Sequence, residues 1–149
     1  MCTVKLSSME KEFVPYPLAL RLKAIEFDEP CMAVYFGNGE NELFTFNPSI
    51  AKEITLRMVE LGHIPCPTYS QAFTWFREEC GIWVTFEYDD CDCVEADICW
   101  YVGKCFRYGI GPLFLTNELG DFKTLQEAEL ACLEKLIQIV ESKQKEDGK

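Results

Sequence analysis

Apolar residues recur every three or four positions between Thr124 and Val140, in the segment TLQEAELACLEKLIQIV. This spacing predicts an amphipathic helix, because residues three and four apart share one side of a helix. Thr124 and Glu127 form a capping box, in which the Thr hydroxyl accepts from a free amide of the first turn. The apolar positions are Leu125, Ala128, Cys132, Leu133, Leu136, Ile137, Ile139 and Val140. A stripe this broad must be covered, and we expect a sheet to cover it.

A second capped helix is predicted over residues 68–80, with the sequence TYSQAFTWFREEC. Thr68 and Gln71 form its capping box, and Gly81 is typical of the position after a last helical turn. The apolar face consists of Tyr69, Ala72, Phe73, Phe76 and Cys80. Trp75 lies roughly 100° from that face, so we expect it at the rim or in a contact with a partner.

The chain before residue 68 alternates between helical and strand patterns. The predicted elements are a helix over 13–27, strands over 31–36 and 42–46, a helix over 47–62 and a linker over 63–67. Pro15 and Pro17 fit a first helical turn, and the sequence GNGEN between the two strands favours a β-hairpin. Asn47 and Pro48 are a typical helix start, and two prolines favour the linker. Residues 1–11 are expected to fray.

The chain after residue 81 predicts an antiparallel sheet. Strand patterns occur at 82–88 and 97–102, a loop is expected over 106–121 with a short strand at 113–115, and residues 142–149 form a solvated tail. Together these elements predict an α+β fold, with one antiparallel sheet of about four to five strands and helices mainly on one face. The second half has the order helix-strand-strand-(strand)-helix. We expect a single domain over 1–149, with 13–62 and 67–142 as possible sub-halves.

Composition narrows the class of protein. The 149 residues are 48% hydrophobic and 13% aromatic, which is typical of a globular chain. No apolar run approaches the ~20 residues that a membrane span requires, and the N-terminus lacks the apolar core of a secretory signal. We therefore expect a cytoplasmic protein without a membrane partner.

The net charge of −11 disfavours nucleic acid as a direct partner, because binding to phosphates requires clustered Lys and Arg. Much of the charge lies between residues 87 and 97, at Glu87, Asp89, Asp90, Asp92, Glu95 and Asp97, with no Lys or Arg among them. A turn needs only one or two such residues, so this acidic segment is the candidate interaction surface. The alternative is a solvated loop that keeps an aromatic-rich protein in solution.

Nine cysteines without a secretion signal indicate reduced thiols. Four of them, Cys91, Cys93, Cys99 and Cys105, are close enough in sequence to suggest a zinc site. Their spacing is not one of the paired CxxC patterns, and a straight strand would separate Cys99 from Cys105 by about 20 Å. We therefore predict no structural metal, with buried or incidental thiols instead.

Two further groups carry potential chemistry. His63, the only histidine, lies near Cys66 in the predicted linker, but neither a cleft nor an activated thiol is indicated there. Glu129 falls inside the apolar arc of the last helix. A carboxylate in the second turn is favoured by the helix N-terminus, and it can pair with Arg77 or Lys123. We predict no catalytic residues and no cofactor.

Three segments, FVPYPLALRLKAIEFDEPC, PTYSQAFTWFREECG and TLQEAELACLEKLIQIVESK, resemble an uncharacterised family of small proteins associated with phages and prophages of gut anaerobes. They cover about a third of the chain, and residues 47–65 look like an addition to the family pattern. The resemblance implies a small cytosolic protein of a mobile element. It implies no activity, cofactor or catalytic residue.

The order of elements in the second half is also similar to a double-stranded-RNA-binding domain. Members of that family place a basic cluster at the start of the last helix. Here this place holds Lys123 against Glu127 and Glu129. The resemblance therefore implies a fold and does not imply RNA binding.

The leading interpretation is a non-enzymatic, acidic interaction module whose partner is a protein with a basic surface. The acidic segment and Trp75 are its candidate contact residues. The alternative is a nucleic-acid-associated regulator that uses the RNA-binding-like half. A metal protein or an enzyme is the least supported class, because no ligand spacing or nucleophile–base pair stands out.

Overall fold

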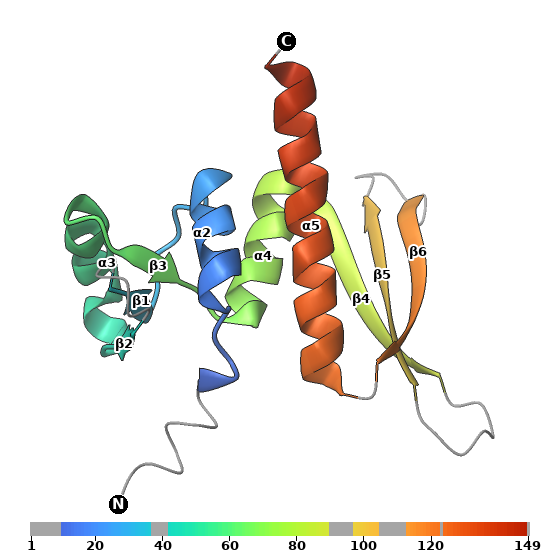
Figure 1. Cartoon of the computed structure of the whole chain (residues 1–149), viewed down its shortest axis with the longest axis horizontal. Helices are drawn as coiled ribbons and strands as arrows, with labels where there is room; N and C mark the ends of the chain where they lie inside the picture. Colours follow the sequence, from blue (N-terminus) through green and yellow to red (C-terminus); the bar gives the residue numbers. More distant parts are fainter. Residues whose placement is uncertain (1–9, 37–41, 90–96, 105–112, 123, 149) are drawn as a thin grey trace, which may run out of the picture. The chain divides into compact units, whose positions relative to one another are not determined.

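The computed structural model describes residues 10–36, 42–89, 97–104, 113–122 and 124–148. The chain forms two compact units, Met1–Gln71 and Ala72–Lys149, and the division falls inside helix α4. Both units combine helices with an antiparallel sheet (Figure 1), which confirms the α+β class. The expectation of one sheet of four to five strands was wrong. The described strands form two separate sheets of three strands each.

The first unit contains α2 (Tyr16–Ala24), β1 (Ala33–Tyr35), β2 (Leu43–Thr45), a 3-10 turn (Pro48–Ile50), α3 (Ala51–Glu60) and β3 (Ile64–Cys66). Its strand order is β2-β1-β3, and both pairings are antiparallel. The predicted hairpin is confirmed, whereas its turn over 37–41 lies outside the described residues. The predicted linker over 63–67 was wrong, because most of it is β3.

The register explains why a proline is tolerated in β3. Ala33 and Tyr35 pair with Cys66 and Ile64, and Val34 lies opposite Pro65. In an antiparallel ladder, pairs that exchange hydrogen bonds alternate with pairs that exchange none. Val34 forms a hydrogen-bonded pair with Phe44 of β2, so its backbone groups point away from β3. Pro65 therefore occupies a position that donates no bond to β1, where its missing N–H costs nothing.

The predicted helix over 47–62 is a 3-10 turn followed by α3. The Asn47 side chain caps the 3-10 turn by accepting from the Ser49 amide at 3.0 Å, whereas α3 begins at Ala51 without a side-chain cap. The predicted end is confirmed, because Gly62 adopts a positive φ of 89° just after the helix. Helix α2 is shorter than the predicted 13–27, because it begins at Tyr16 and ends at Ala24. Phe13 instead forms an isolated antiparallel bridge with Thr68.

A buried hydroxyl joins α3 to the chain that enters β1. Thr55 is 5% exposed, and its Oγ1 accepts from the Cys31 amide at 3.0 Å. The same hydroxyl lies 2.9 Å from the Cys31 carbonyl and 2.6 Å from the Ala51 carbonyl, so its single proton is shared between two acceptors. Side-chain bonds of this kind satisfy backbone groups that the short strands leave without a ladder partner.

The Val14 carbonyl is a second buried junction in this unit. It accepts from the Tyr35 hydroxyl at 2.9 Å and from the Cys66 thiol at 3.3 Å. The Val14 amide donates to the Pro67 carbonyl at 3.0 Å, and the Tyr69 amide donates to the Glu12 carbonyl at 3.1 Å. Residues before α2 are thereby held beside the segment that leads into α4.

The second unit has the predicted order of helix, three strands and helix. Its elements are α4 (Tyr69–Cys80), β4 (Ile82–Asp89), β5 (Asp97–Lys104), β6 (Leu113–Phe122) and α5 (Leu125–Asp147). Strand β6 is much longer than the expected 113–115, and residues 116–121 are not loop. The predicted tail over 142–149 is largely exposed as far as Gly148, but it is helical and not a separate segment, because α5 continues to Asp147.

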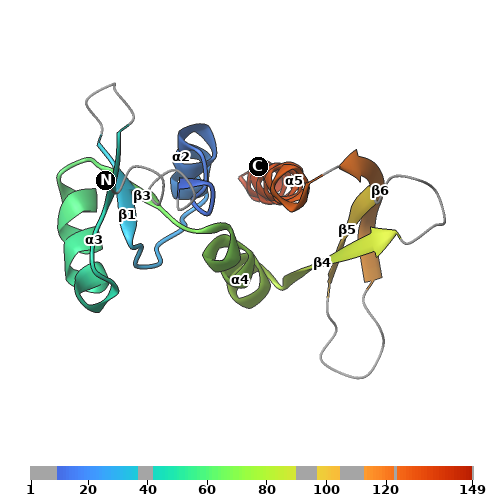
Figure 2. The same ribbon diagram turned by 90° about the horizontal axis from the view of Figure 1, so that it is seen from below.

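Helix α5 packs on one face of the β4-β5-β6 sheet through contacts with β5 and β6 (Figure 2). Thr124 caps it as predicted, accepting from the Glu127 amide at 3.2 Å. Its fully buried residues are Ala128, Cys132, Leu133, Leu136 and Ile137. Leu125, in the first turn, and Leu130 are each 40% exposed. The buried stripe is the one that the sequence predicts, except that Leu125 is exposed and that Ile139 and Val140 are half-buried.

Candidate functional site

The acidic segment lies at the end of the β4–β5 hairpin. Glu87 and Asp89 belong to β4, and Asp97 is the first residue of β5. The register pairs Asp89 with Asp97 and Glu87 with Cys99. Three other predicted residues, Asp90, Asp92 and Glu95, lie outside the described residues. Half of the predicted acidic segment is thus placed on paired strands instead of in a turn.

This pairing has an energetic consequence. Like charges at directly opposite positions of an antiparallel pair destabilise the pairing. Asp89 and Asp97 occupy such opposite positions. Among the described strands, the longest uninterrupted pairing therefore ends with two acidic residues in opposite positions. Solubility alone does not require this register, because the same charges on a helix surface would serve equally well.

Trp75 was predicted at the rim, and this was wrong. It is 6% exposed, and its ring packs edge-to-face on Phe76 with centroids 5.1 Å apart. The buried residues of α4 are Tyr69, Ala72, Trp75 and Phe76, whereas Phe73 and Cys80 are half-buried. The buried stripe is thus rotated towards Trp75 and away from Phe73. Trp75 belongs to the core and not to the candidate surface.

The cysteine cluster is only partly described. Cys99 lies on β5, opposite Glu87, and Cys91, Cys93 and Cys105 lie outside the described residues. Within the described ranges, no three His, Cys, Asp or Glu residues gather where they could hold a metal ion. The absence of a structural metal therefore stays a prediction.

Cys66 is part of the core of the first unit and not of a linker. Its thiol is fully buried and donates to the Val14 carbonyl. Burial raises the pKa of Cys66 to about 12, and hydrogen bonds with the Tyr35 hydroxyl and the Val14 backbone oppose this effect only in part. A nucleophilic thiol requires the opposite shift. His63, three residues earlier, packs its ring edge-to-face on Phe36 at 4.9 Å.

The other described cysteines have the same character. Burial raises the pKa of Cys31 and Cys132 above the ordinary range of a thiol, and it also raises the pKa of the half-buried Cys80. Glu129, the carboxylate predicted inside the apolar arc, is half-buried and adds to the shift of Cys132 through its negative charge. The pairing of Glu129 with Arg77 or Lys123 stays a prediction. All four thiols favour the neutral form.

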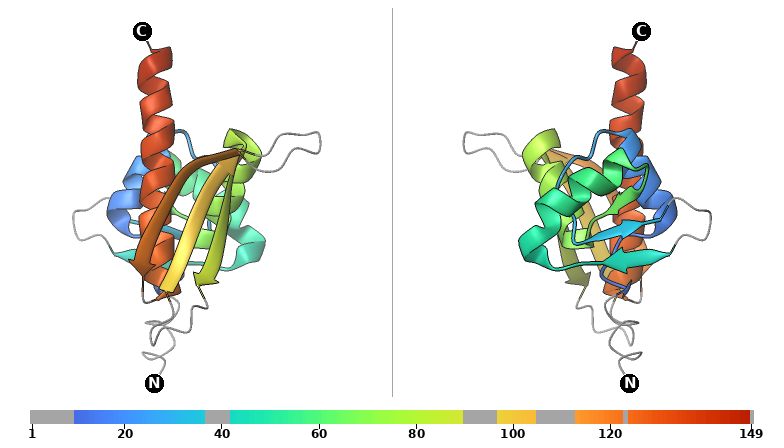
Figure 3. Two further views of the ribbon diagram at one scale, coloured as in Figure 1. Left: turned by 90° about the vertical axis from the view of Figure 1, so that its right-hand side faces the viewer. Right: turned by 90° about the vertical axis from the view of Figure 1, so that its left-hand side faces the viewer.

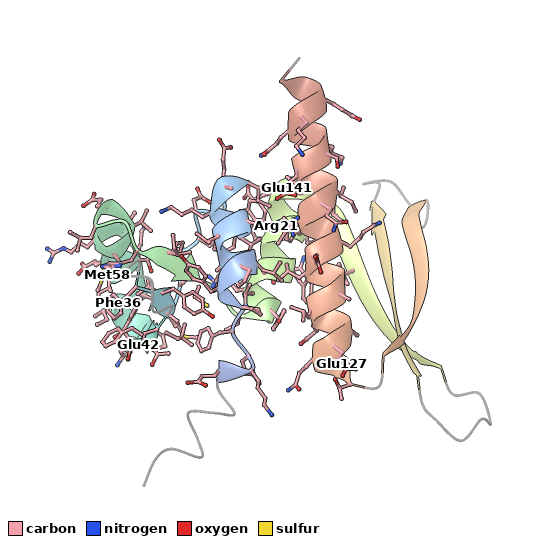
Figure 4. All side chains as sticks on the ribbon, in the orientation of Figure 1. Arg21, Phe36, Glu42, Met58, Glu127 and Glu141 are labelled. Atoms are coloured by element: carbon pink, nitrogen blue, oxygen red, sulfur yellow. The ribbon has the colours of Figure 1, made fainter. Side chains whose placement is uncertain are left out.

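The start of α5 carries the charge that the sequence indicates. Glu127 is exposed in its first turn, as Figure 4 shows, and Lys123 lies outside the described residues. Carboxylates at a helix N-terminus are favoured by the helix dipole, whereas phosphate would be repelled by them. The order of elements matches the RNA-binding-like half, but the charge of this helix start does not match its function.

Comparison of the chain with models of protein families, with curated proteins and with solved structures finds no match. Among the described residues, no helix is both long enough and apolar enough to span a membrane. The resemblance to phage-associated proteins therefore stays a prediction. The hairpin that carries the acidic segment is the feature on which a function can be argued.

Proposed function

We propose that the protein is a non-enzymatic, acidic interaction module of the cytoplasm, derived from a mobile element, that docks on a basic surface of another protein. The register of β4 and β5 supports this proposal, because it brings Asp89 opposite Asp97 at the expense of hairpin stability. Stability lost for no structural gain is typical of residues kept for binding. The net charge of −11 adds attraction to any cationic partner.

The buried thiols support the non-enzymatic part of the proposal. Cys31, Cys66 and Cys132 are fully buried, and burial raises the pKa of each. Thiols in this state are poor nucleophiles and poor metal ligands, because both roles require the thiolate. They behave as small apolar residues of the core.

The experiment is partner capture from the native lysate on immobilised full-length protein. The test variant replaces Asp89, Asp90 and Asp92 by Asn, and the control replaces Glu53 by Gln, Glu146 by Gln and Asp147 by Asn. Both remove three charges, but the control positions are exposed helix residues far from the hairpin in sequence. We expect the test variant to lose capture at low salt and the control to retain it.

Equal capture of partners by wild type and test variant across a salt series would show that the acidic segment only maintains solubility.

The second candidate function is a nucleic-acid-associated regulator, which the order α4-β4-β5-β6-α5 favours on topology alone. A parallel capture from nuclease-treated lysate tests it. Capture that disappears with nuclease would support that alternative. Capture that survives nuclease and requires the three Asp residues supports the interaction module.

A further inference from the structure

The sheet of the first unit has two edges, and the edge at β3 is closed to further strands. The register directs the backbone groups at positions 63, 65 and 67 away from β1. Pro65 and Pro67 have no N–H to offer there. The Pro67 carbonyl accepts from the Val14 amide at 3.0 Å. The His63 amide donates to the Met58 carbonyl at 2.9 Å. The outward donors of this edge are thus absent or already used.

The edge at β2 is open. The Phe46 amide donates to the Met32 carbonyl at 2.9 Å, which places Phe46 and Phe44 at the positions that bond to β1. The alternation of an antiparallel ladder then directs the N–H and C=O groups of Leu43 and Thr45 away from β1. Among the described residues, no hydrogen bond uses these outward groups. The right view of Figure 3 shows β2 as the border of this sheet, where a further strand can pair.

An exposed aromatic ring lies on the open edge. Phe44 is 47% exposed, and its ring packs on that of Phe36 with centroids 5.5 Å apart. The other two residues of β2 are Leu43, which is half-buried, and Thr45, which is exposed. Pro, Lys and bulges are common protections of an edge strand, and β2 has none of them. Its length of three residues alone limits pairing, so a contact made here is short.

We propose that β2 pairs antiparallel with β2 of a second copy of this chain, about a two-fold axis at Phe44, so that two three-stranded sheets join into one. In this register Leu43 of each copy lies opposite Thr45 of the other, and each such pair exchanges two hydrogen bonds. Phe44 lies opposite Phe44 in a non-hydrogen-bonded pair, where side chains approach most closely. Aromatic pairs across strands are favourable, and this one covers the ring that a single copy exposes.

The charges beside β2 are compatible with a second copy. In this register the exposed Glu42 lies opposite Phe46 of the other copy and not opposite the second Glu42. The two Glu42 positions are then about 13 Å apart along the strand, which exceeds the Debye length of about 8 Å at physiological salt. Any extended strand could use the outward backbone groups, but a second copy also supplies a ring that pairs with Phe44. The contact does not involve the acidic segment, so it is independent of the proposed function.

The experiment is sedimentation equilibrium of the full-length protein with reductant, which excludes copies linked by disulfides. A contact this small is weak, so the protein concentration is varied from about 5 µM to about 500 µM. We expect the average mass to rise with concentration from the 17.2 kDa of one chain towards twice that value. Hydrogen exchange at residues 42–47 of the wild type should slow over the same range, because pairing protects the Leu43 and Thr45 amides.

A proline at the outward position tests the edge directly. Thr45→Pro removes the outward N–H but no bond to β1, and so reproduces the state of Pro65 at the closed edge. Each dimer loses two hydrogen bonds, so the Kd of dimerisation should rise by about tenfold or more. The matched control, Thr45→Val, keeps the N–H and should change Kd by less than about twofold. Phe44→Leu keeps an apolar side chain without the ring, and its Kd should rise by about threefold.

A further control asks whether association follows apolar exposure alone. Leu61, the residue after α3, is 73% exposed, the highest value among the large apolar residues that the structure describes. Because Leu61 lies outside β2, we expect Leu61→Ser to leave Kd unchanged. Loss of association in Leu61→Ser, with association retained in Thr45→Pro, would place the contact at the end of α3 and overturn the pairing of β2.

Circular dichroism establishes that each variant is folded before the masses are compared. A single-chain mass of the wild type at every concentration overturns the proposal and leaves a strand of a different protein as the candidate occupant of the edge. Equal Kd values for Thr45→Pro and Thr45→Val overturn it as well, because the outward amide would then contribute nothing. If Thr45→Pro does not fold, hydrogen exchange decides, and equal exchange at 42–47 in dilute and concentrated wild type overturns the pairing.

Discussion

The two units reach a similar architecture by different means. The strands of the first unit are three residues long, whereas those of the second are eight and ten residues long. Short strands make few ladder bonds, and the first unit adds buried side-chain bonds at Thr55 and at the Val14 carbonyl. The second unit has a 23-residue helix whose buried stripe is entirely apolar apart from the Cys132 thiol.

This difference indicates which kind of substitution destabilises each unit. A sheet with few ladder bonds depends on particular polar atoms, and removing one atom leaves buried groups without a partner. A sheet covered by a long helix depends on volume, and removing several buried carbons leaves a cavity. Substitutions that remove one polar atom should therefore destabilise the first unit most, and substitutions that remove buried side-chain volume should destabilise the second unit most.

The largest effect is expected in the second unit. Leu136 is fully buried on α5, and Leu136→Ala should lower the free energy of unfolding by about 2–5 kcal/mol through lost burial and a cavity. Leu130→Ala, on the 40% exposed side of the same helix, is the matched control and should cost about 0.5 kcal/mol. Urea unfolding followed by circular dichroism measures both. Similar costs at the two positions would contradict the packing described for α5.

An intermediate effect is expected from alkaline pH, and mainly in the first unit. Burial raises the pKa of Cys66 from 9.0 to about 12, and it raises that of Cys31 as well. The folded state then keeps protons that the unfolded state releases above pH 9, so stability is complete below that pH and falls as pH rises. Each thiol should cost about 1.4 kcal/mol per pH unit between pH 9 and its folded pKa.

Hydrogen exchange read by mass spectrometry, at pH 8 and pH 10 in the presence of reductant and corrected for the intrinsic exchange rate, assigns this loss to a unit. Peptides from residues 10–36 should lose more protection than those from α5, where Cys132 is the single fully buried thiol. Cys66→Ala should reduce the pH dependence. A uniform loss along the chain would mean that the thiols of the first unit do not control it.

The smallest effect is expected from a single hydroxyl. Thr55→Val keeps the shape of the side chain but removes the acceptor of the Cys31 amide, so the free energy of unfolding should fall by about 1–2 kcal/mol. Thr55→Ser keeps the hydroxyl and serves as the control, with a loss of the methyl group alone. Thermal unfolding of the two variants compares them directly. A greater loss for Ser than for Val would show that the methyl group matters more than the bonds.

Most of the helices could be predicted from local signals in the sequence. Thr124 caps α5 and Asn47 caps the 3-10 turn before α3, as their residue types predict, because capping depends on neighbours in sequence. The end of α5 was missed because the apolar period stops at Val140. The Glu, Lys and Gln residues beyond it are strong helix formers, and they continue the helix without a buried face.

Features that depend on residues distant in sequence could not be predicted from the sequence. Pro65 was interpreted as a linker residue because a proline is usually excluded from a sheet. Only the register of β1 with β2 and β3 shows that this position of β3 donates no hydrogen bond. Trp75 was assigned to the rim because the side from which a helix is covered is a tertiary property. The acidic segment was visible as composition. Its pairing of Asp89 with Asp97 required the register.

The bridge between the start of the chain and the entrance to α4 has a consequence for folding. Phe13 pairs with Thr68, and the Val14 amide bonds to the Pro67 carbonyl, so the two sides of this closure are more than fifty residues apart in sequence. During synthesis, residues 12–14 leave the ribosome long before their partners exist. The β1–β2 hairpin can form early, whereas the Val14 amide finds its partner only after Pro67 has emerged, and the Glu12 carbonyl only after Tyr69. Residues 12–14 are thus synthesised early but are among the last of the unit to be fixed in place.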